Sequence, residues 1–196
     1  MTETGLFGGS FNPIHNGHIA LARNLLDAAG LDEIWFVVSP QNPLKQQAGL
    51  LDDTARLDMV RTALASEPRL KACDYEFRLP KPSYTWNTLQ HLSRDCPDRR
   101  FTLLIGADNW QMFGRWYHHE DILNHYAIVI YPRSGSHVDT TALPAGVTLV
   151  NTPLFDISST EVRRRIACGE PIDGLVPDII RDDALRHYAI KRPEKQ

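Results

Sequence analysis

Short runs of mostly apolar residues, separated by helical patterns, determine the fold class of this 196-residue chain. The runs at 34–38 and 101–105 are apolar at consecutive rather than alternate positions, as in strands that are covered on both faces. Such strands, alternating with helices, predict a parallel α/β sheet. We expect strands at 5–7, 34–39, 101–105, 126–131 and 147–150.

Helical periodicity fills the intervals between these runs. Apolar residues at helical spacing predict a helix over 17–29, and Gly30 stands where a left-handed C-cap residue belongs. Further helices are expected from Asp52-Asp53, from about Thr85, from Ser158 to Gly169, and over 177–188. The stretches 40–50 and 134–146 carry Pro and Gly and are expected to be long loops, which often hold ligands.

Length and charge limit the class of protein. A chain of 196 residues is long enough for one domain with its own hydrophobic core. We expect one domain over 1–196, with a C-terminal helical portion at about 157–190 packed on it. The net charge of −3 gives no general attraction to nucleic acids or anionic lipid, so any affinity for phosphate must be built locally. A small phosphorylated ligand is therefore expected, and no nucleic-acid partner.

The sequence also predicts a cytoplasmic protein without a membrane partner. No apolar run approaches the ~20 residues that span a bilayer, and the first residues lack a basic region followed by an apolar one. Cys73, Cys96 and Cys168 are odd in number and lack the paired spacing of a zinc site, so free thiols are expected.

The segment richest in chemical signals follows the first expected strand and leads into the first expected helix. Residues 8–18 read GGSFNPIHNGH. Gly8 and Gly9 let the backbone approach a bulky anion, and amides at a helix N-terminus offer donors in a positive field. His15 and His18 are three residues apart, so both rings can project from one face. A metal site is the alternative for such a pair, but the glycines favour phosphate.

A second segment, ISSTEVRRR at 157–165, permits two interpretations. In the first, Ser158 is an N-cap, Glu161 completes a capping box, and the arginines form a solvated face. In the second, the hydroxyl-rich helix start and Arg163, one turn further on, bind an anion. The segment alone leaves both open.

The two motifs, in this order, resemble those of the HIGH-motif α/β nucleotidyltransferases. Three further segments, PSYTWNTL at 82–89, IGADN at 105–109 and Trp116-Tyr117, are similar to bacterial nicotinate mononucleotide adenylyltransferases. The resemblance covers nearly the whole chain. It implies a single-domain Rossmann-like nucleotidyltransferase fold with a central, mainly parallel sheet and helices on both faces.

The resemblance also implies a reaction and its residues. The 5′-phosphate of nicotinate mononucleotide attacks the α-phosphorus of ATP, giving nicotinate adenine dinucleotide and pyrophosphate in NAD biosynthesis, with Mg²⁺ carried by ATP and no dedicated metal site. The catalytic residues implied are His15, His18, Lys45 and Arg163. The ATP-binding residues implied are Gly8, Gly9, Ser10, Phe11, His15, His18, Ser158, Ser159, Thr160 and Arg163. The mononucleotide-binding residues implied are Tyr84, Thr85, Asp108, Trp116 and Tyr117.

Each of these roles has a plainer alternative. Thr85 can be a helix N-cap, and one ring of Trp116-Tyr117 can serve core packing. Lys45 can be a solvated loop residue, because the family often has a histidine just before the basic residue and this chain has Leu44. In the family the aspartate at Asp108 contacts ribose hydroxyls, and an aromatic ring at Trp116-Tyr117 stacks on the pyridine.

Two other functions compete with this one. A related adenylyl- or cytidylyltransferase would act on another acceptor, such as phosphopantetheine or a phosphorylated alcohol, and Tyr84, Asp108 and Trp116 argue against it. A non-catalytic nucleotide-binding module would keep the fold, but His15 and His18 are both intact. The preference for the acid over the amide mononucleotide, and whether the chain forms a homo-oligomer, stay open at this point.

Overall fold

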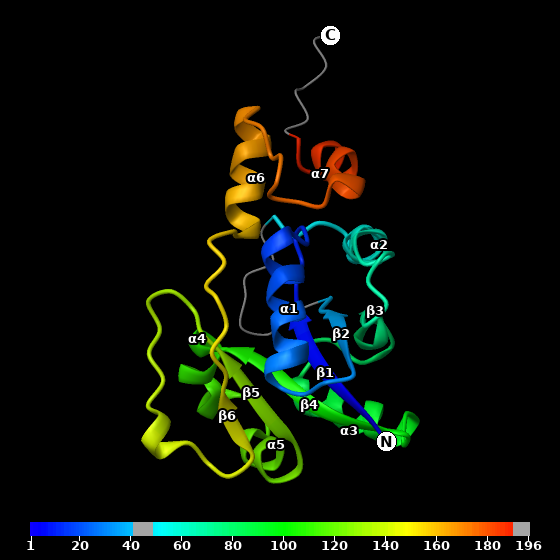
Figure 1. Ribbon diagram of the computed structural model, residues 1–196. Coiled ribbons are helices and arrows are strands. Elements are labelled where there is room, and N and C mark those ends of the chain that lie inside the picture. The colour runs from blue at the N-terminus through cyan, green and yellow to red at the C-terminus, as the bar shows by residue number, and fades with distance from the viewer. Residues whose placement is uncertain (41–48, 190–196) are drawn as a thin grey trace.

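The computed structural model describes residues 1–40 and 49–189. They form a six-stranded sheet in the order β3-β2-β1-β4-β5-β6, in which every neighbouring pair is parallel (Figure 1). The predicted α/β class is therefore confirmed. The strands are β1 Thr2–Gly9, β2 Glu33–Val38, β3 Leu70–Cys73, β4 Arg99–Gly106, β5 Ala127–Tyr131 and β6 Val147–Leu149.

Helices connect the strands. The α-helices are α1 Asn16–Ala28, α2 Asp53–Ala63, α3 Thr85–Asp95, α4 Ala107–Gln111, α5 His119–His125, α6 Ser159–Cys168 and α7 Arg181–Tyr188. Short 3-10 helices are η1 Tyr75–Arg78, η2 Phe113–Arg115, η3 Thr140–Ala142 and η4 Asp178–Ile180. Gly30, with a φ of 63°, follows Ala29, the C-cap of α1, and Gly169 has a φ of 68° at the C-cap of α6, so both predicted helix ends are confirmed.

The alternation of side chains along each strand gives the sheet two cores. Leu6 of β1 belongs to a buried cluster with Leu89 of α3, whereas its neighbour Phe7 belongs to a second cluster with Leu25 of α1. The helices therefore cover both faces of the sheet. This explains why the strands appear in the sequence as consecutive apolar runs rather than alternating ones.

One strand was not predicted, and two local predictions are wrong. The sheet has a strand that the sequence did not predict, β3, because its four residues include the exposed Lys71 and form no apolar run. Thr85 is not the N-cap of α3 but its first residue, and Tyr84 occupies the cap position. The last expected helix, 177–188, is divided into η4 and α7.

The order of the strands positions the ligand-binding edge. Strand β1 pairs with β2 on one side and β4 on the other, so the chain leaving β1 crosses toward β2 while the chain leaving β4 crosses toward β5. The connections diverge at the carboxyl ends of β1 and β4. Parallel α/β sheets bind ligands in the crevice at such a point.

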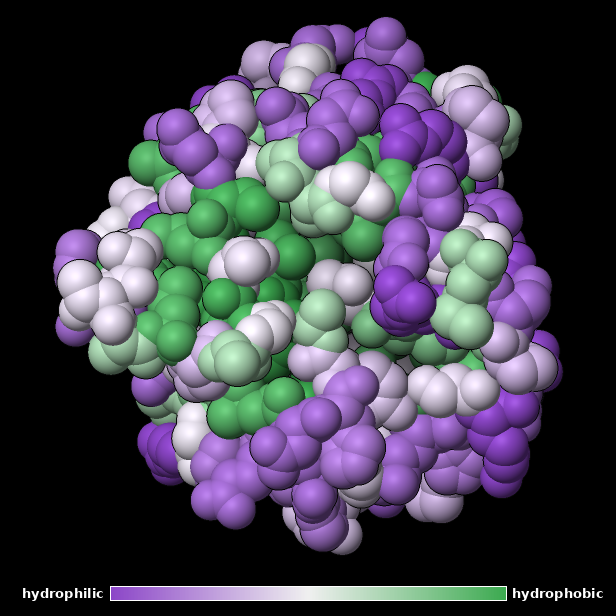
Figure 2. Space-filling view, turned by 60° about the horizontal axis from the view of Figure 1, so that its bottom comes forward, coloured by the Kyte–Doolittle hydropathy of each residue, from purple (hydrophilic) through white to green (hydrophobic). Residues whose placement is uncertain are grey.

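Figure 2 shows one face of the molecule, on which apolar side chains gather in one area bordered by hydrophilic ones. The large apolar side chains that are exposed among the described residues are Met1, Met112, Tyr117, Leu149, Leu154, Ile179 and Leu185. One of them, Tyr117, belongs to the pocket described below. Within residues 1–40 and 49–189, none of the helices has both the length and the apolar character needed to cross a lipid bilayer.

Candidate active site

The turn that leaves β1 begins with two glycines in different environments. A Cβ on Gly9 would lie 2.9 Å from the ring of Phe11, so the packing of that ring requires a glycine. A Cβ on Gly8 would meet no atom of the described residues within 4 Å. Phe11 has a φ of 44° and is 2 % exposed, so only its backbone can reach a ligand. Gly8 is thus where an anion can approach the main chain closely.

The ring of each histidine in the turn accepts a hydrogen bond from the backbone amide of the other. His15 is the N-cap of α1, and its Nδ1 accepts a hydrogen bond from the amide of His18 at 3.3 Å. In return, Nδ1 of His18 accepts from the amide of His15 at 3.2 Å. The rings stack with their centroids 3.5 Å apart. Since both Nδ1 atoms accept, the proton of each neutral ring lies on Nε2, which can donate to an anion.

The electrostatics of His15 keep its ring neutral. The residue is 4 % exposed, and this burial, together with the positive charge of Arg133, lowers the pKa of His15 to about 3. His15 can therefore offer an N–H donor at neutral pH but no positive charge.

Helix α6 brings the second motif to the first. The Ser159 hydroxyl donates to the carbonyl of Pro13 at 2.8 Å. Nη1 of Arg163 donates to the carbonyl of Asn12 at 2.7 Å, and Nη2 to the Thr160 hydroxyl at 3.3 Å. Segments about 150 residues apart in sequence thus form one site at the start of two helices. Both helix N-termini can offer donors to phosphate there.

The capping prediction for α6 is half confirmed. The Ser158 hydroxyl accepts from the amide of Glu161 at 3.1 Å, as expected of an N-cap. Glu161 does not complete a capping box, however, because its carboxylate pairs with Arg164 and Arg165. These arginines lower the pKa of Glu161 to about 2. Arg164 and Arg165 are thus paired with Glu161, whereas the side chain of Arg163 contacts the turn that contains the histidines.

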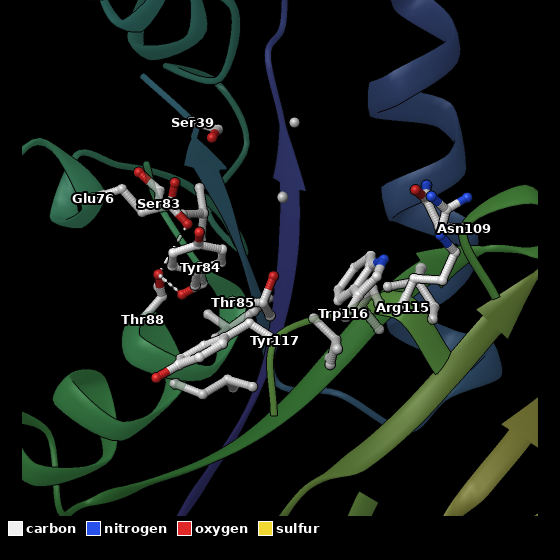
Figure 3. A pocket seen from close by; sticks show the side chains of 18 of the residues that line it. Ser39, Glu76, Ser83, Tyr84, Thr85, Thr88, Asn109, Arg115, Trp116 and Tyr117 are labelled. Atoms are coloured by element: carbon white, nitrogen blue, oxygen red, sulfur yellow. Dashed lines mark hydrogen bonds between the residues drawn. The ribbon is translucent and has the colours of Figure 1, made fainter. Parts of the chain in front are cut away.

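A pocket opens beside this site at the carboxyl ends of β1, β2 and β4, in the crevice that the strand order predicts (Figure 3). Gly8 and Gly9 form part of its wall. The start of α3, helix α4, and η2 with the segment after it supply the aromatic and polar side chains around it: Tyr84, Thr85, Thr88, Asn109, Arg115, Trp116 and Tyr117. Four residues of the predicted mononucleotide site therefore line one cavity.

The two rings of Trp116-Tyr117 have different surroundings. Trp116 packs partly against the core next to Phe113, at 5.4 Å between ring centroids. Tyr117 is 49 % exposed and lies 4.8 Å from the ring of Tyr84. Core packing accounts for part of the Trp116 contacts and for none of the exposed face of Tyr117.

Some buried polar atoms of the pocket make no well-formed hydrogen bond. Among the described residues, these are Oε2 of Glu76, the Ser83 hydroxyl and Nε1 of Trp116, and all three residues line the pocket. The Ser39 and Ser83 hydroxyls are nevertheless close enough to the Glu76 carboxylate to act on its pKa, so Nε1 of Trp116 is the atom there without any partner in residues 1–40 and 49–189. The other oxygen of Glu76 accepts from the Thr88 hydroxyl at 3.0 Å. Burial raises the pKa of the Glu76 carboxyl. Unpaired polar groups are costly in a protein interior, so this cavity is suited to a polar ligand or water.

Charged groups lie at the ends of β4 and β5. Asp108, in α4, follows β4 directly, and Nε of Arg133 lies 3.8 Å from its Oδ1. The guanidinium of Arg133 also lies 5.7 Å from the ring centroid of Tyr131. The sequence motifs do not include Arg133. Its place just after a strand, like that of Asp108, is the signal that could have found it.

Arg56 is a second residue that the motifs do not include. It is fully buried, and its guanidinium donates to the carbonyl of Ser10, to that of Ser39 at 3.0 Å and to that of Leu51 at 2.9 Å. The carboxylate of Asp53 balances the charge of Arg56, with its Oδ1 2.6 Å from Nη2 of the arginine. Arg56 thereby joins the turn after β1 to the segments that flank residues 41–48.

Comparison with known proteins agrees with this site. The family model described as Cytidylyltransferase-like matches residues 6–165. A relative from Bacteroides fragilis is 49 % identical over 171 residues, covering 87 % of this chain and 85 % of the relative. Another, from Cytophaga hutchinsonii, is 45 % identical over 174 residues, covering 89 % and 91 %. Both are described as a "Probable nicotinate-nucleotide adenylyltransferase".

This chain belongs to the nicotinate-nucleotide adenylyltransferase family. The resemblance seen in its motifs is confirmed, and the chain is a nucleotidyltransferase. A solved structure of Plasmodium falciparum nicotinic acid mononucleotide adenylyltransferase complexed with NaAD matches with a TM-score of 0.77, covering 95 % of this chain and 94 % of that one. At 19 % identity, this match shows that the family fold is shared.

The adenylyltransferase fold brings together most of the predicted site residues. The turn with His15 and His18 meets Ser159 and Arg163, and the pocket gathers Tyr84 with Trp116. Asp108 lies at the neighbouring strand end. Lys45 lies outside the described residues, so its role stays a prediction.

Proposed function

We propose that this member of the family transfers the adenylyl group of ATP to nicotinate mononucleotide, giving nicotinate adenine dinucleotide and pyrophosphate for NAD biosynthesis. One observation carries the proposal: the same residues border both the phosphate site, at the starts of α1 and α6, and the aromatic pocket. Gly8 and Gly9 belong both to the turn before the histidines and to the pocket. The phosphates of one nucleotide at the turn therefore lie next to a second nucleotide in the pocket.

The mononucleotide occupies the pocket in this proposal. Trp116 stacks on the pyridine ring, and Tyr84, Thr85 and Tyr117 surround it. Asp108 accepts hydrogen bonds from the ribose. The Ser83 hydroxyl, which makes no well-formed hydrogen bond with the described residues, is the proposed donor to the acid group of the pyridine. Arg133 lies beside Asp108, and its positive charge also acts on His15, so it is the proposed partner of the 5′-phosphate.

ATP places its phosphates over the starts of α1 and α6, where donors and helix dipoles favour anions. Arg163 supplies the positive charge, while His15 and His18 supply imidazole donors. The other predicted ATP-binding residues contribute backbone or hydroxyl donors around them: Gly8, Gly9, Ser10, Phe11, Ser158, Ser159 and Thr160. Lys45 is proposed as a further phosphate contact.

The chemistry is a single in-line displacement. An oxygen of the mononucleotide phosphate forms a bond to the α-phosphorus of ATP while the bond from that phosphorus to the bridging oxygen breaks, and pyrophosphate leaves with the electron pair. No enzyme group is modified covalently. Catalysis consists of positioning the two nucleotides and stabilising the charge that develops between them.

Mg²⁺ enters this reaction as part of the ATP substrate. In the part of the chain that the structure describes, no group of three or more His, Cys, Asp or Glu residues could hold a metal ion. The triphosphate oxygens are themselves ligands that Mg²⁺ favours. The chain's own residues then bind the phosphates rather than the ion.

The proposed unit of function is the whole chain, 1–196, with the helical portion at about 157–190 packed on the sheet domain. Two contacts support it. The Ser159 hydroxyl donates to the carbonyl of Pro13, and the amide of Asn16 donates to the carbonyl of Leu175 at 2.8 Å. Both contacts join the helical portion to the histidine turn.

Pyrophosphate release from ATP and Mg²⁺ tests the proposal, with nicotinate mononucleotide, its amide and phosphopantetheine offered separately. We expect release with the first, and slower release with the amide. Release with phosphopantetheine alone would keep the nucleotidyltransferase class and overturn the acceptor. No release with any of them would favour a nucleotide-binding module.

A further inference from the structure

The last described helix reaches the histidine turn through one side chain. Tyr188, at the end of α7, donates its hydroxyl hydrogen to Oδ1 of Asn12 at 2.6 Å. Burial raises the pKa of this hydroxyl, against the charges of Arg56 and Arg163, so the group stays protonated and donates. The contact spans 176 residues of sequence.

Asn12 uses its other polar atoms as well. The side chain is buried, at 5 % exposed, and its Nδ2 donates to the carbonyl of Gly49 at 3.0 Å. Its Oδ1 also accepts from the amide of Leu51 at 3.2 Å, and its carbonyl accepts from Arg163. One residue thus joins the histidine turn to α6, to α7 and to the segment after residue 48.

We propose that Tyr188, acting through Asn12, is a positioning residue for the phosphates of ATP. The inference rests on the proposed function, which assigns the histidine turn and Arg163 to ATP. Tyr188 itself touches neither reacting group. It holds the Asn12 side chain, and the carbonyl of the same residue receives Arg163.

The physical reason is the cost of ordering the site. Arg163 is a long side chain, and an arginine that is already held in place loses less conformational freedom when an anion binds. Because several segments of the chain hold the histidine turn in place, the distance between the donors of His15 and His18 stays constant. Removing the Tyr188 hydroxyl removes one of those restraints and leaves the aromatic ring in place.

The effect should be confined to ATP. Neither Tyr188 nor Asn12 lines the pocket assigned to the mononucleotide. The residues around that pocket that come from α3 and η2 have their own contacts, such as Thr88 with Glu76. Tyr188→Phe should therefore change binding of one nucleotide and not of the other.

Calorimetric titration of the full chain tests this, with α,β-methylene ATP plus Mg²⁺ in one series and nicotinate mononucleotide in the other. Loss of one neutral hydrogen bond changes an equilibrium by about two- to tenfold. For Tyr188→Phe we expect about a fivefold higher Kd for the ATP analogue and a Kd for the mononucleotide within about twofold of wild type. Tyr126→Phe is the matched control, because its hydroxyl also has one side-chain partner, Ser93 at 3.1 Å, away from the turn. It should leave both Kd values unchanged.

The outcomes separate the two claims. An unchanged Kd for the ATP analogue in Tyr188→Phe, or equal increases for both nucleotides, would overturn the inference. If the wild type binds the ATP analogue but not the mononucleotide, the proposed acceptor fails while the Tyr188 comparison still decides the inference. If the wild type binds no ATP analogue, both fail.

A second variant tests the route through Asn12. In Asn12→Ala the Tyr188 hydroxyl has already lost its acceptor, so Tyr188→Phe added to that background should change the Kd for the ATP analogue no further. If the Kd for the ATP analogue in the double variant rises by the product of the two single-variant factors, Tyr188 acts by a path that does not include Asn12.

Discussion

The two halves of the site are built differently. In the phosphate half, the side chains of Asn12, His15 and Arg163 are all hydrogen-bonded within the protein, at distances of 2.6 to 3.3 Å. In the pocket half, Glu76, Ser83 and Trp116 each keep a buried polar atom that makes no well-formed hydrogen bond with the described residues. The protein completes the first half by itself, and the second has polar atoms left for a ligand.

This difference fits the two proposed ligands. A triphosphate is common to many nucleotides, so a rigid cradle of donors suits it and lowers the cost of binding. Discrimination between similar acceptors needs polar groups that go unpaired with the wrong molecule. The pocket half is therefore where we place the choice of acceptor.

The largest expected effect comes from breaking the phosphate half at His18. His18→Ala should lower kcat by about a hundredfold or more, because one preorganised donor typically contributes ~3 kcal/mol to the transition state. Steady-state pyrophosphate release measures it, and a circular dichroism spectrum checks that the variant is folded. Near-normal turnover in a folded variant would remove His18 from catalysis.

Stability should depend on Arg56 next. Arg56→Met leaves the carbonyls of Ser10, Ser39 and Leu51 without their donor and should lower the free energy of unfolding by about 3 kcal/mol. Denaturant unfolding measures this change. Arg61→Met, in the same helix, is the matched control, because its side chain is 51 % exposed and should change stability by less than about 0.5 kcal/mol. Equal stability of the two variants would contradict the buried role of Arg56.

Asp108→Ala sharpens the comparison from the pocket side. Loss of the ribose contact should raise the KM for nicotinate mononucleotide about tenfold and change the KM for ATP by less than about twofold. Initial rates with each substrate varied in turn give both values. If the KM for ATP rises instead, Asp108 belongs to the phosphate half.

The smallest expected effect is a pH dependence at Glu76. Burial raises the pKa of this carboxyl in the folded chain above its unfolded value, so the folded state holds the extra proton. The stability it contributes is present below the unfolded pKa and is lost as pH rises through the folded pKa. Glu76→Gln has no carboxyl to ionise and does not lose this stability. Its melting temperature should therefore rise by a few degrees relative to that of wild type as pH rises from 4 to 8. A constant difference across that range would show that Glu76 ionises as freely as an exposed carboxyl.

The strands and the phosphate half could be predicted because their signals are local. Consecutive apolar runs identify β2 and β4, and the glycines before His15 lie within one short segment. Ser158 was recognisable as an N-cap for the same reason, since its partner is three residues away. The pairing of Arg163 with Asn12 needed the fold, because it spans 151 residues.

The residues that the sequence did not predict lack such local signals. Arg56 lies in an amphipathic helix where a charged residue normally faces solvent, and only the arrangement of three loops buries it. Glu76 stands in a short 3-10 helix with no periodic pattern. The capping box expected at Glu161 fails because two nearby arginines compete for the same carboxylate.

Amide hydrogen exchange of the free protein, and of its complexes with nicotinate mononucleotide and with α,β-methylene ATP, tests the difference between the halves most directly. We predict that residues 15–18 and 161–165, most of whose amides are already bonded within the protein, exchange slowly without ligand and change little when the ATP analogue binds. Residues 83–88 and 113–118 should exchange faster and slow clearly with the mononucleotide. The opposite pattern, a protected pocket and a phosphate turn that becomes protected only with ATP, would contradict it.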